Sequence, residues 1–317
     1  MDALTSLLNG PRARGAFLLR TVLDPPWSLR IRDRAPLSLF TMIRGTGWVL
    51  RDGDAPVRFG TGDVVIVRGP EPYTVADDPG TAPQVVVDPG QVCTAPDGTA
   101  LTWPTALGVR TWGHRPDGSV VLLCGTYQCA GEISGRLLGA LPPLLVVPDG
   151  PWNRALVPLL NEEIVQDGPG QEVVLDRLLD LLLIAALRAW FSQSEVTAPG
   201  WYRALDDPVV GPALRTMQDE PTQPWTVAML AERSGVSRAA LARRFTELVG
   251  EPPMAFLTGW RLDLAADLLR EPNATIGSVA RQVGYGSAFA LSTAFKRVRG
   301  LTPQQHRTTP ADLTPAR

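Results

Sequence analysis

The sequence predicts an α+β protein with a β-rich N-terminal barrel or sandwich, a helical linker and an all-α C-terminal domain. Three observations support this prediction. Short apolar stretches alternate with turn residues as far as Pro143, helical spacing of apolar residues begins near Trp152, and only helical spacing follows Trp201. The 317 residues are enough for two domains of ordinary size.

The β-rich part is predicted from short apolar stretches that lie between turn signals. Turn residues recur at Asp52-Gly53, Gly62-Asp63, Asp97-Gly98 and Asp117-Gly118. Many short strands at such spacing favour an antiparallel sandwich or barrel. The predicted strands cover residues 37–43, 47–50, 57–59, 64–67, 84–87 and 120–124.

Two helices are predicted after the strands, over residues 156–164 and 171–191, because apolar residues in both recur at helical spacing. The pair could pack within a core or form a subunit interface, and we expect a homodimer. Residues 192–200 are polar and contain Pro and Gly, which predicts a domain linker.

The C-terminal part is predicted to contain only helices, which Gly and Pro residues separate. The predicted helices cover residues 208–219, 227–233, 238–249, 254–270, 276–283, 288–298 and 303–307. Their arrangement carries an internal repeat, and this repeat is the most informative feature of the sequence.

The repeat has an interval of about 50 residues. Each copy has a small residue in one helix, a glycine in the turn, and a serine, a leucine and a phenylalanine in the next helix. These residues are Ala231, Gly235, Ser237, Leu241 and Phe245 in the first copy, and Ala280, Gly284, Ser287, Leu291 and Phe295 in the second. The small residue allows a close helix crossing, glycine adopts a positive φ at low cost, and serine caps the second helix. The repeat therefore predicts two helix-turn-helix units, whose second helices fit a DNA major groove.

The stretch from Trp225 to Arg307 resembles the DNA-binding domain of the AraC/XylS family of transcription regulators. The matching motifs cover about a quarter of the chain and lie at residues 225–231, 237–245, 253–257, 260–262, 276–284 and 303–307. His306 departs from the family, which more often has Tyr or Phe at this position, and we expect an effect on packing of the last turn. The resemblance implies a sequence-specific DNA-binding regulator rather than an enzyme.

The resemblance also implies that both recognition helices address adjacent major-groove faces on one side of the DNA. It assigns base contacts to Ala239, Ala242, Arg243, Ala288, Phe289 and Thr293. Phosphate contacts are expected from Ser237, Arg238, Arg244, Ser287, Lys296 and Arg297. Arg243 is the best candidate for a bidentate guanine contact, which is worth about 1–3 kcal/mol of discrimination. Phe289 and the alanines can contact only thymine methyl groups, so we expect less hydrogen-bonded specificity from the second unit.

The N-terminal part resembles the cupin fold at residues 60–65, where a Gly-Asp turn precedes an apolar strand. AraC-family regulators often carry a cupin-like effector domain in this position, and residues 136–143 also resemble that branch. We therefore expect a cupin-like sensing domain, a helical dimerisation and linker segment, a double helix-turn-helix domain and a flexible tail. Their expected bounds are 1–145, 146–200, 201–308 and 309–317.

A cupin enzyme is the main alternative to a regulator. Metal-dependent cupins bind their metal through clustered His and carboxylate ligands, whereas this chain has only His114 and His306, and His306 lies in the DNA-binding part. We expect no metal, no cofactor and no catalytic residues. A metal-independent cupin enzyme, or a ligand-binding protein fused to a DNA-binding domain, stays open as an alternative function.

Two kinds of signal are open for the cupin-like domain. A small organic effector could bind among aromatic residues, for which the candidates are Trp48, Tyr73 and Trp103. Alternatively, cysteines could sense oxidants, as in some cupin-type relatives; the candidates are Cys93, Cys124 and Cys129. A continuous strand would place the Cα atoms of Cys124 and Cys129 roughly 16 Å apart, whereas a disulfide requires less than about 7 Å. Cys93 is therefore the freer partner.

The net charge of −2 identifies no partner, although the residues from Trp201 onwards contain 14 basic and 11 acidic side chains. Residues 1–20 do not form a secretory signal, and no apolar run is long enough to span a bilayer. Three cysteines make no disulfide framework, which favours the reducing cytoplasm. We expect double-stranded DNA as the partner, with RNA polymerase and an unidentified small effector as candidates, and no membrane.

Overall fold

The computed structural model describes residues 17–99, 101, 105–127, 138–139, 141–193 and 199–308. The described residues between 17 and 127 and between 141 and 193 form one compact unit, and those between 199 and 308 form a second. None of the described helices is both long enough and apolar enough to cross a membrane.

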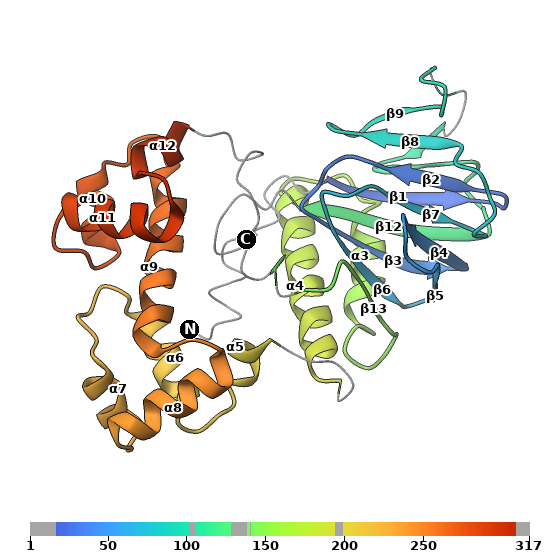
Figure 1. Cartoon of the computed structure of the whole chain (residues 1–317). Coiled ribbons are helices and arrows are strands. Elements are labelled where there is room, and N and C mark those ends of the chain that lie inside the picture. Colours follow the sequence, from blue (N-terminus) through green and yellow to red (C-terminus); the bar gives the residue numbers. More distant parts are fainter. Residues whose placement is uncertain are drawn as a thin grey trace. The chain divides into compact units, whose positions relative to one another are not determined.

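The first unit contains two β-sheets that pack face to face (Figure 1). The seven-stranded sheet has the spatial order β10 (Thr105–Gly108), β11 (Thr111–Gly113), β1 (Phe17–Leu23), β12 (Val120–Tyr127), β3 (Leu37–Arg44), β6 (Val64–Arg68) and β13 (Leu144–Val147). The six-stranded sheet has the order β5 (Val57–Gly60), β4 (Thr46–Arg51), β7 (Tyr73–Ala76), β2 (Ser28–Ile31), β8 (Val85–Asp88) and β9 (Val92–Thr94). Most neighbouring strands are antiparallel, but β1 pairs with β11, and β2 with β8, in parallel.

Apolar side chains from both sheets fill the space between them. Phe40 packs edge-on against Phe59 at 5.5 Å between ring centroids and is stacked against Tyr73 at 6.2 Å. Residues 64–67 of β6 are all buried, with Val65 and Val67 facing this core. A strand that is covered on both faces has a continuous apolar run rather than an alternating one, as the sequence of β6 has.

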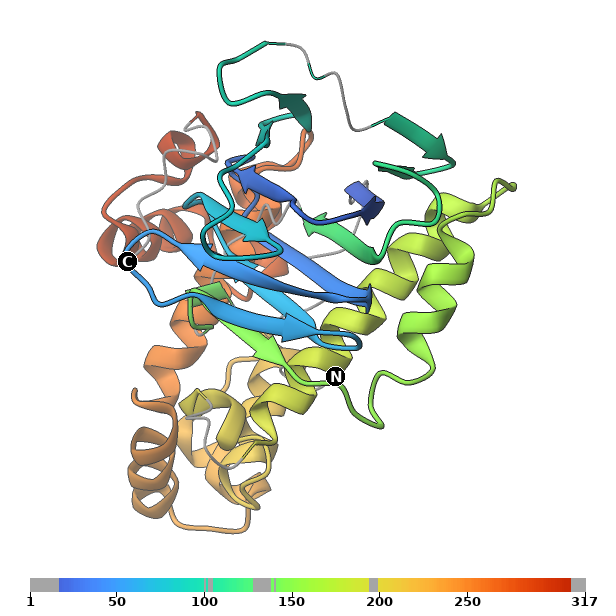
Figure 2. The same cartoon turned by 90° about the vertical axis from the view of Figure 1, so that its right-hand side faces the viewer.

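The outer face of the seven-stranded sheet is covered by α3 (Leu156–Glu163) and α4 (Gln171–Phe191), and α4 lies alongside the strands in Figures 1 and 2. The buried residues of α4 recur at helical spacing and include Leu175, Leu179, Leu182 and Ala186. This stripe faces the sheet, because Leu179 contacts β12 at Gly125.

The second unit contains only helices. They are α5 (Gly200–Arg203), α6 (Val210–Asp219), α7 (Val227–Arg233), α8 (Arg238–Val249), α9 (Pro253–Leu269), α10 (Ile276–Gln282), α11 (Ala288–Arg299) and α12 (Pro303–Thr308). In Figure 1, α9 runs between the α7–α8 pair and the α10–α11 pair. A second apolar core joins α9, α10 and α11.

The predicted fold class is confirmed: a β-rich N-terminal domain precedes an all-helical C-terminal domain. All six predicted strands are present, as are the predicted helices, with shifts of a few residues at their ends. The sequence did not predict β1, β2, β7, β9, β10, β11, β13 or the four-residue helix α5. The expected domain bounds stay predictions, and the expected tail, 309–317, lies outside the described residues.

Candidate DNA-binding interface and ligand pocket

The first helix-turn-helix unit consists of α7 and α8. Gly235 in its turn has φ of +67°, which glycine adopts without the steric cost of a Cβ atom. Ser237 caps α8, since its hydroxyl accepts a hydrogen bond from the amide of Ala240 at 3.2 Å. Leu241 and Phe245 are fully buried and hold α8 in the domain. Gly235, Ser237, Leu241 and Phe245 therefore have the structural roles that their types predict.

The second unit, α10 and α11, repeats this geometry. Gly284 has φ of +83°, and a Cβ atom there would lie 2.8 Å from the carbonyl oxygen of Pro221. Ser287 caps α11 by accepting a hydrogen bond from the amide of Ala290 at 3.1 Å. Phe295 is fully buried and its ring lies 5.5 Å from that of His306. His306 thus packs in the last turn where the family has an aromatic ring, and its Nε2 lies 3.1 Å from the carbonyl oxygen of Ala266.

Helix α9 fixes the two units to one another. Near its start, Phe256 packs against Phe245 of α8 with 5.8 Å between ring centroids. In its middle, Arg261 donates to the carbonyl oxygens of Pro221 and Gln223, both at 2.6 Å, in the segment before α7. Asp263 forms an ion pair with Arg299 at the end of α11, and both side chains are largely buried. One rigid helix therefore positions both recognition helices, α8 and α11.

The six predicted base-contact residues lie on the solvent-facing sides of α8 and α11. Phe289 is 81% exposed, so its ring is accessible to a binding partner. The Arg243 side chain is 77% exposed and forms an ion pair of 3.7 Å with Glu247. Such an exposed ion pair contributes little to stability, so Arg243 can leave Glu247 and turn towards a base edge at little cost in free energy. Ala239, Ala288 and Thr293 are exposed as well, and Ala242 is half-buried.

The predicted phosphate-contact residues differ in their surroundings. Arg238, Lys296 and Arg297 are exposed and form no ion pair with any described residue. Ser237 and Ser287 are exposed as well, but their hydroxyls already cap the recognition helices.

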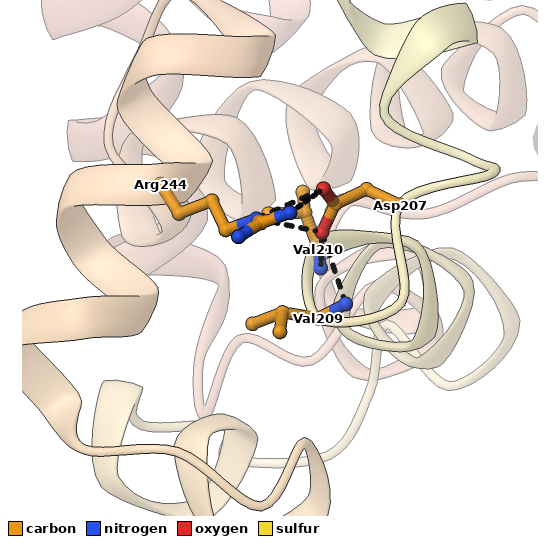
Figure 3. A network of polar contacts seen from close by, with 4 residues as sticks. All are labelled: Asp207, Val209, Val210 and Arg244. Atoms are coloured by element: carbon orange, nitrogen blue, oxygen red, sulfur yellow. Dashed lines mark hydrogen bonds and ion pairs between the residues drawn. The ribbon is translucent and has the colours of Figure 1, made fainter.

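Arg244, another predicted phosphate contact, forms an ion pair with an aspartate of the same domain. Its Nε and Nη2 donate to the carboxylate of Asp207 at 2.9 and 2.7 Å (Figure 3).

Asp207, which the sequence analysis did not single out, connects the start of α6 to the recognition helix α8. Its Oδ1 accepts hydrogen bonds from the amides of Val209 and Val210, both at 2.9 Å, while Arg244 approaches from α8. Burial opposes ionisation, but the bonds from Arg244, Val210 and Val209 outweigh it and hold the pKa of Asp207 below its usual value. An aspartate just before an apolar helix is a capping pattern, and this was the one feature of the sequence that indicated its role.

The first unit has a cavity of about 60 Å³ between its two sheets. Its wall is mainly apolar and includes Tyr73, one of the three aromatic residues predicted for an effector pocket. Trp48 is not in the wall, and Trp103 lies outside the described residues. Phe40, Trp112 and Asp33 also lie in the wall, and no signal in the sequence indicated them. Leu122, Cys124 and Thr126 alternate along β12, so only the register of this strand could have placed them in the wall.

Two of the predicted redox cysteines, Cys93 and Cys124, line this same cavity. Burial, followed by the nearby charge of Asp33, raises the pKa of Cys124 to about 12. Burial and then Asp88 raise the pKa of Cys93 as well, although Cys93 is the more exposed of the two. Cys129 lies outside the described residues. Among the residues that the structure describes, no three His, Cys, Asp or Glu side chains form a metal-binding cluster.

Strand β12 connects the cavity to α4. Its residues Leu122, Cys124 and Thr126 line the cavity, and the intervening residues face the helices. A Cβ atom on Gly125 would lie 2.7 Å from a δ-carbon of Leu179, so β12 and α4 are in close contact. The hydroxyl of Tyr127 donates to the carbonyl oxygen of Leu179 at 2.7 Å. Only strand β12 therefore separates the cavity from α4 at this point.

Comparison with known proteins agrees with this architecture. A family model described as a cupin matches residues 2–192, and one described as a helix-turn-helix domain matches residues 230–309. An AraC-like transcription regulator of Streptomyces lividans is 34% identical over 316 residues, which cover 98% of this chain and 99% of that protein. The chain belongs to the AraC-like transcription regulators with an N-terminal cupin domain. As a member of this family it is a DNA-binding regulator and not an enzyme.

Two further transcriptional regulators are similar to this chain. The RCS-specific HTH-type transcriptional activator RclR of Escherichia coli is 26% identical over 321 residues, which cover 99% of this chain and all of that protein. The DNA-binding domain of AdpA, solved in complex with a target DNA, is 29% identical. That comparison covers 32% of this chain and 91% of the AdpA domain, with a TM-score of 0.31.

Proposed function

We propose that this AraC-like regulator binds a specific DNA sequence by placing α8 and α11 in adjacent major-groove segments on one side of the duplex. The observation that carries the proposal is that α9 contacts both units while the outward faces of both recognition helices stay exposed. Sequence specificity requires base-edge contacts, and exposed side chains on a helix that fits the groove supply them.

The two units are proposed to discriminate bases by different means. In α8, Arg243 donates two hydrogen bonds to one guanine, flanked by close approach of Ala239 and Ala242. In α11, Phe289 contacts a thymine methyl group, and Thr293 supplies a hydroxyl that can bond to either type of base edge. Ala288 is small enough to let the backbone approach the groove. The first unit therefore contributes most of the hydrogen-bonded specificity.

The phosphate contacts are proposed to position these helices on the duplex. Arg238 lies at the start of α8, and Lys296 and Arg297 lie in the last turns of α11, so cations flank both recognition helices. Ser237 and Ser287 lie at the helix starts, where backbone amides also favour a phosphate oxygen. Arg244 could reach a phosphate only by sharing or leaving Asp207, so we expect its contribution to be smaller than that of Arg238.

The control of DNA binding is proposed to lie in the cavity of the cupin domain. A small ligand bound there would contact β12, which in turn contacts α4 through Gly125 and Tyr127. The ligand can favour one state of the protein only by its difference in affinity for the two states. Oxidation is a second candidate signal, because Cys93 and Cys124 line the same cavity and the similar protein RclR is an RCS-specific transcriptional activator. The raised pKa of Cys124 favours Cys93 as the thiol that reacts first.

The protein is further proposed to act in the cytoplasm as a homodimer through α3 and α4. Five apolar side chains on and between these helices are exposed: Leu159, Val165, Val173, Val174 and Leu181. Exposed apolar groups that gather on one element mark an interaction surface, and a second copy of the chain can cover them. Sedimentation equilibrium should give a dimer that Leu181→Asp weakens and Met229→Asp, an exposed apolar position elsewhere, does not. Equal effects of the two variants would contradict this interface.

Selection of bound sequences from a random DNA library by the full-length chain tests the proposed recognition. We expect one enriched motif that spans two adjacent major-groove segments. Arg243→Ala should relax the motif at one guanine and reduce discrimination there by about 1–3 kcal/mol. The matched variant Arg238→Ala should weaken binding to all sequences alike and lower the salt dependence. Binding with no preferred sequence, or an unchanged motif with Arg243→Ala, would contradict the proposal.

A further inference from the structure

The cavity of the cupin domain contains one carboxylate. Its described wall is formed mainly by apolar and aromatic side chains, and Asp33 is the only acidic residue among them. With a volume of about 60 Å³, the cavity has room for roughly four or five water-sized groups. A ligand that fits is therefore small and mostly apolar, and its polar end meets the carboxylate.

Asp33 is held in place from two loops. Its Oδ1 accepts a hydrogen bond from the amide of Ala35 at 3.0 Å, in the connection between β2 and β3. Its Oδ2 accepts one from the side-chain amide of Gln91 at 3.2 Å, in the turn between β8 and β9. Gln91 adopts φ of +62°, which is uncommon for a residue with a side chain. The two loops thus converge to orient a carboxylate at the cavity wall.

No cation neutralises this carboxylate within the described part of the chain. The preceding residue, Arg32, is engaged with Asp88, to which it donates through Nε and Nη2. The following residue, Arg34, is exposed and forms no ion pair with a described residue. The negative charge of Asp33 reaches the buried wall, because it contributes after burial to the raised pKa of Cys124. Asp33 is half-buried, so a cation in the cavity can form an ion pair with its carboxylate.

The rest of the wall also suits a cation with an apolar body. Phe40, Tyr73 and Trp112 are aromatic, and aromatic faces attract cations. Two polar atoms of cavity-lining residues, Trp112 Nε1 and Thr126 Oγ1, are buried and have no hydrogen-bond partner among the described residues. A ligand with more than one hydrogen-bonding group can use them as well as Asp33.

We propose that the effector of this regulator is a small hydrophobic amine, whose ammonium group forms an ion pair with Asp33 while its apolar body lies against Phe40 and Trp112. This inference rests on the proposed role of the cavity as the effector site. Gln91 acts through Asp33: its side-chain amide donates to the carboxylate and orients it towards the ammonium group. Neutral molecules of the same shape bind more weakly because they form no ion pair with Asp33, and anionic ones are excluded because Asp33 repels them.

Titration calorimetry of the full-length chain with n-butylamine, 1-butanol and pentanoate tests the proposal, since the three probes share one butyl group. We expect the amine to bind at least tenfold more tightly than the alcohol, with no binding of pentanoate. Asp33→Asn should abolish the preference for the amine, and Asp33→Glu, which keeps the charge, should retain part of it. The control Asp54→Asn removes an exposed carboxylate on the β4–β5 turn and should leave the preference unchanged.

The possible results separate cleanly. Equal affinities for the amine and the alcohol, an amine preference that survives Asp33→Asn, or no binding by any probe would each overturn the proposal. Near-ultraviolet circular dichroism of Asp33→Asn establishes that a loss of binding is not a loss of folding. DNA binding is measured on the same preparations, because failure of sequence-specific binding would refute the proposed function while leaving an amine preference intact.

Discussion

Gly125→Ala should destabilise the cupin domain although alanine is usually the better residue in a strand. Replacing glycine restricts the unfolded chain, which stabilises a strand by about 0.5–1 kcal/mol. The new Cβ atom, however, would lie 2.7 and 2.8 Å from the two δ-carbons of Leu179. Leu179 is only 1% exposed, so the side chains packed around it leave little room for another rotamer. Overpacking of this kind costs about 1–3 kcal/mol, so the clash outweighs the gain.

The net effect is a loss of about 1 kcal/mol, which lowers the melting temperature of a domain of this size by roughly 2–4 °C. Thermal unfolding followed by far-ultraviolet circular dichroism measures it. Leu179→Ala removes the δ-carbons that the new Cβ atom would meet, and by itself it costs about 2–5 kcal/mol of stability. In that background Gly125→Ala should stabilise the domain instead of destabilising it. Additive effects of the two substitutions, or a Gly125→Ala variant at least as stable as the parent, would refute the packing argument.

Three further outcomes are expected. Ser237→Ala removes the cap of α8 and should cost the C-terminal domain about 1 kcal/mol of unfolding free energy in urea titrations; an unchanged midpoint would contradict this. Because the folded pKa of Asp207 is lowered, its contacts stabilise above the ordinary carboxyl pKa of about 4 and are lost as the pH falls through the lower folded value. Asp207→Asn should therefore reduce the loss of stability at acid pH. Identical curves of stability against pH for the parent and the variant would argue against the ion pair. Phe289→Ala should weaken binding by about 1 kcal/mol, and deoxyuridine in place of the contacted thymidine should weaken the parent but not the variant in fluorescence anisotropy.

The sequence predicted the C-terminal domain well because local rules determine it. Glycine at a positive φ and serine at a helix start act within a few residues, so Gly235, Ser237 and their second copies had the same roles in sequence and structure. The Arg244–Asp207 pair was not predicted, because its partners are 37 residues apart and meet only through tertiary packing. Contacts of this kind depend on helix orientation, which periodicity does not provide.

The N-terminal domain was predicted less completely. Strands such as β3 and β6 have long apolar runs between turns, whereas β9 and β11 have three residues each and no pattern to detect. Strand β13 begins just after Pro143, where the β-rich part was expected to end. The cavity could not be predicted either, because its wall combines residues of both sheets and register decides which of them face inward. Of the aromatic residues predicted for an effector pocket, Tyr73 lies in the wall of this cavity and Trp48 does not.

Hydroxyl-radical footprinting of the full-length chain on its selected DNA site tests the central claim most directly, namely that α8 and α11 bind the same face of one duplex. The account predicts two protected backbone segments about one helical turn, or roughly 10 base pairs, apart on one side of the DNA for each protomer. Phe289→Ala should weaken protection of one segment and Arg243→Ala that of the other. A single protected segment for each protomer, or weakening of the same segment by both variants, would contradict two-unit recognition.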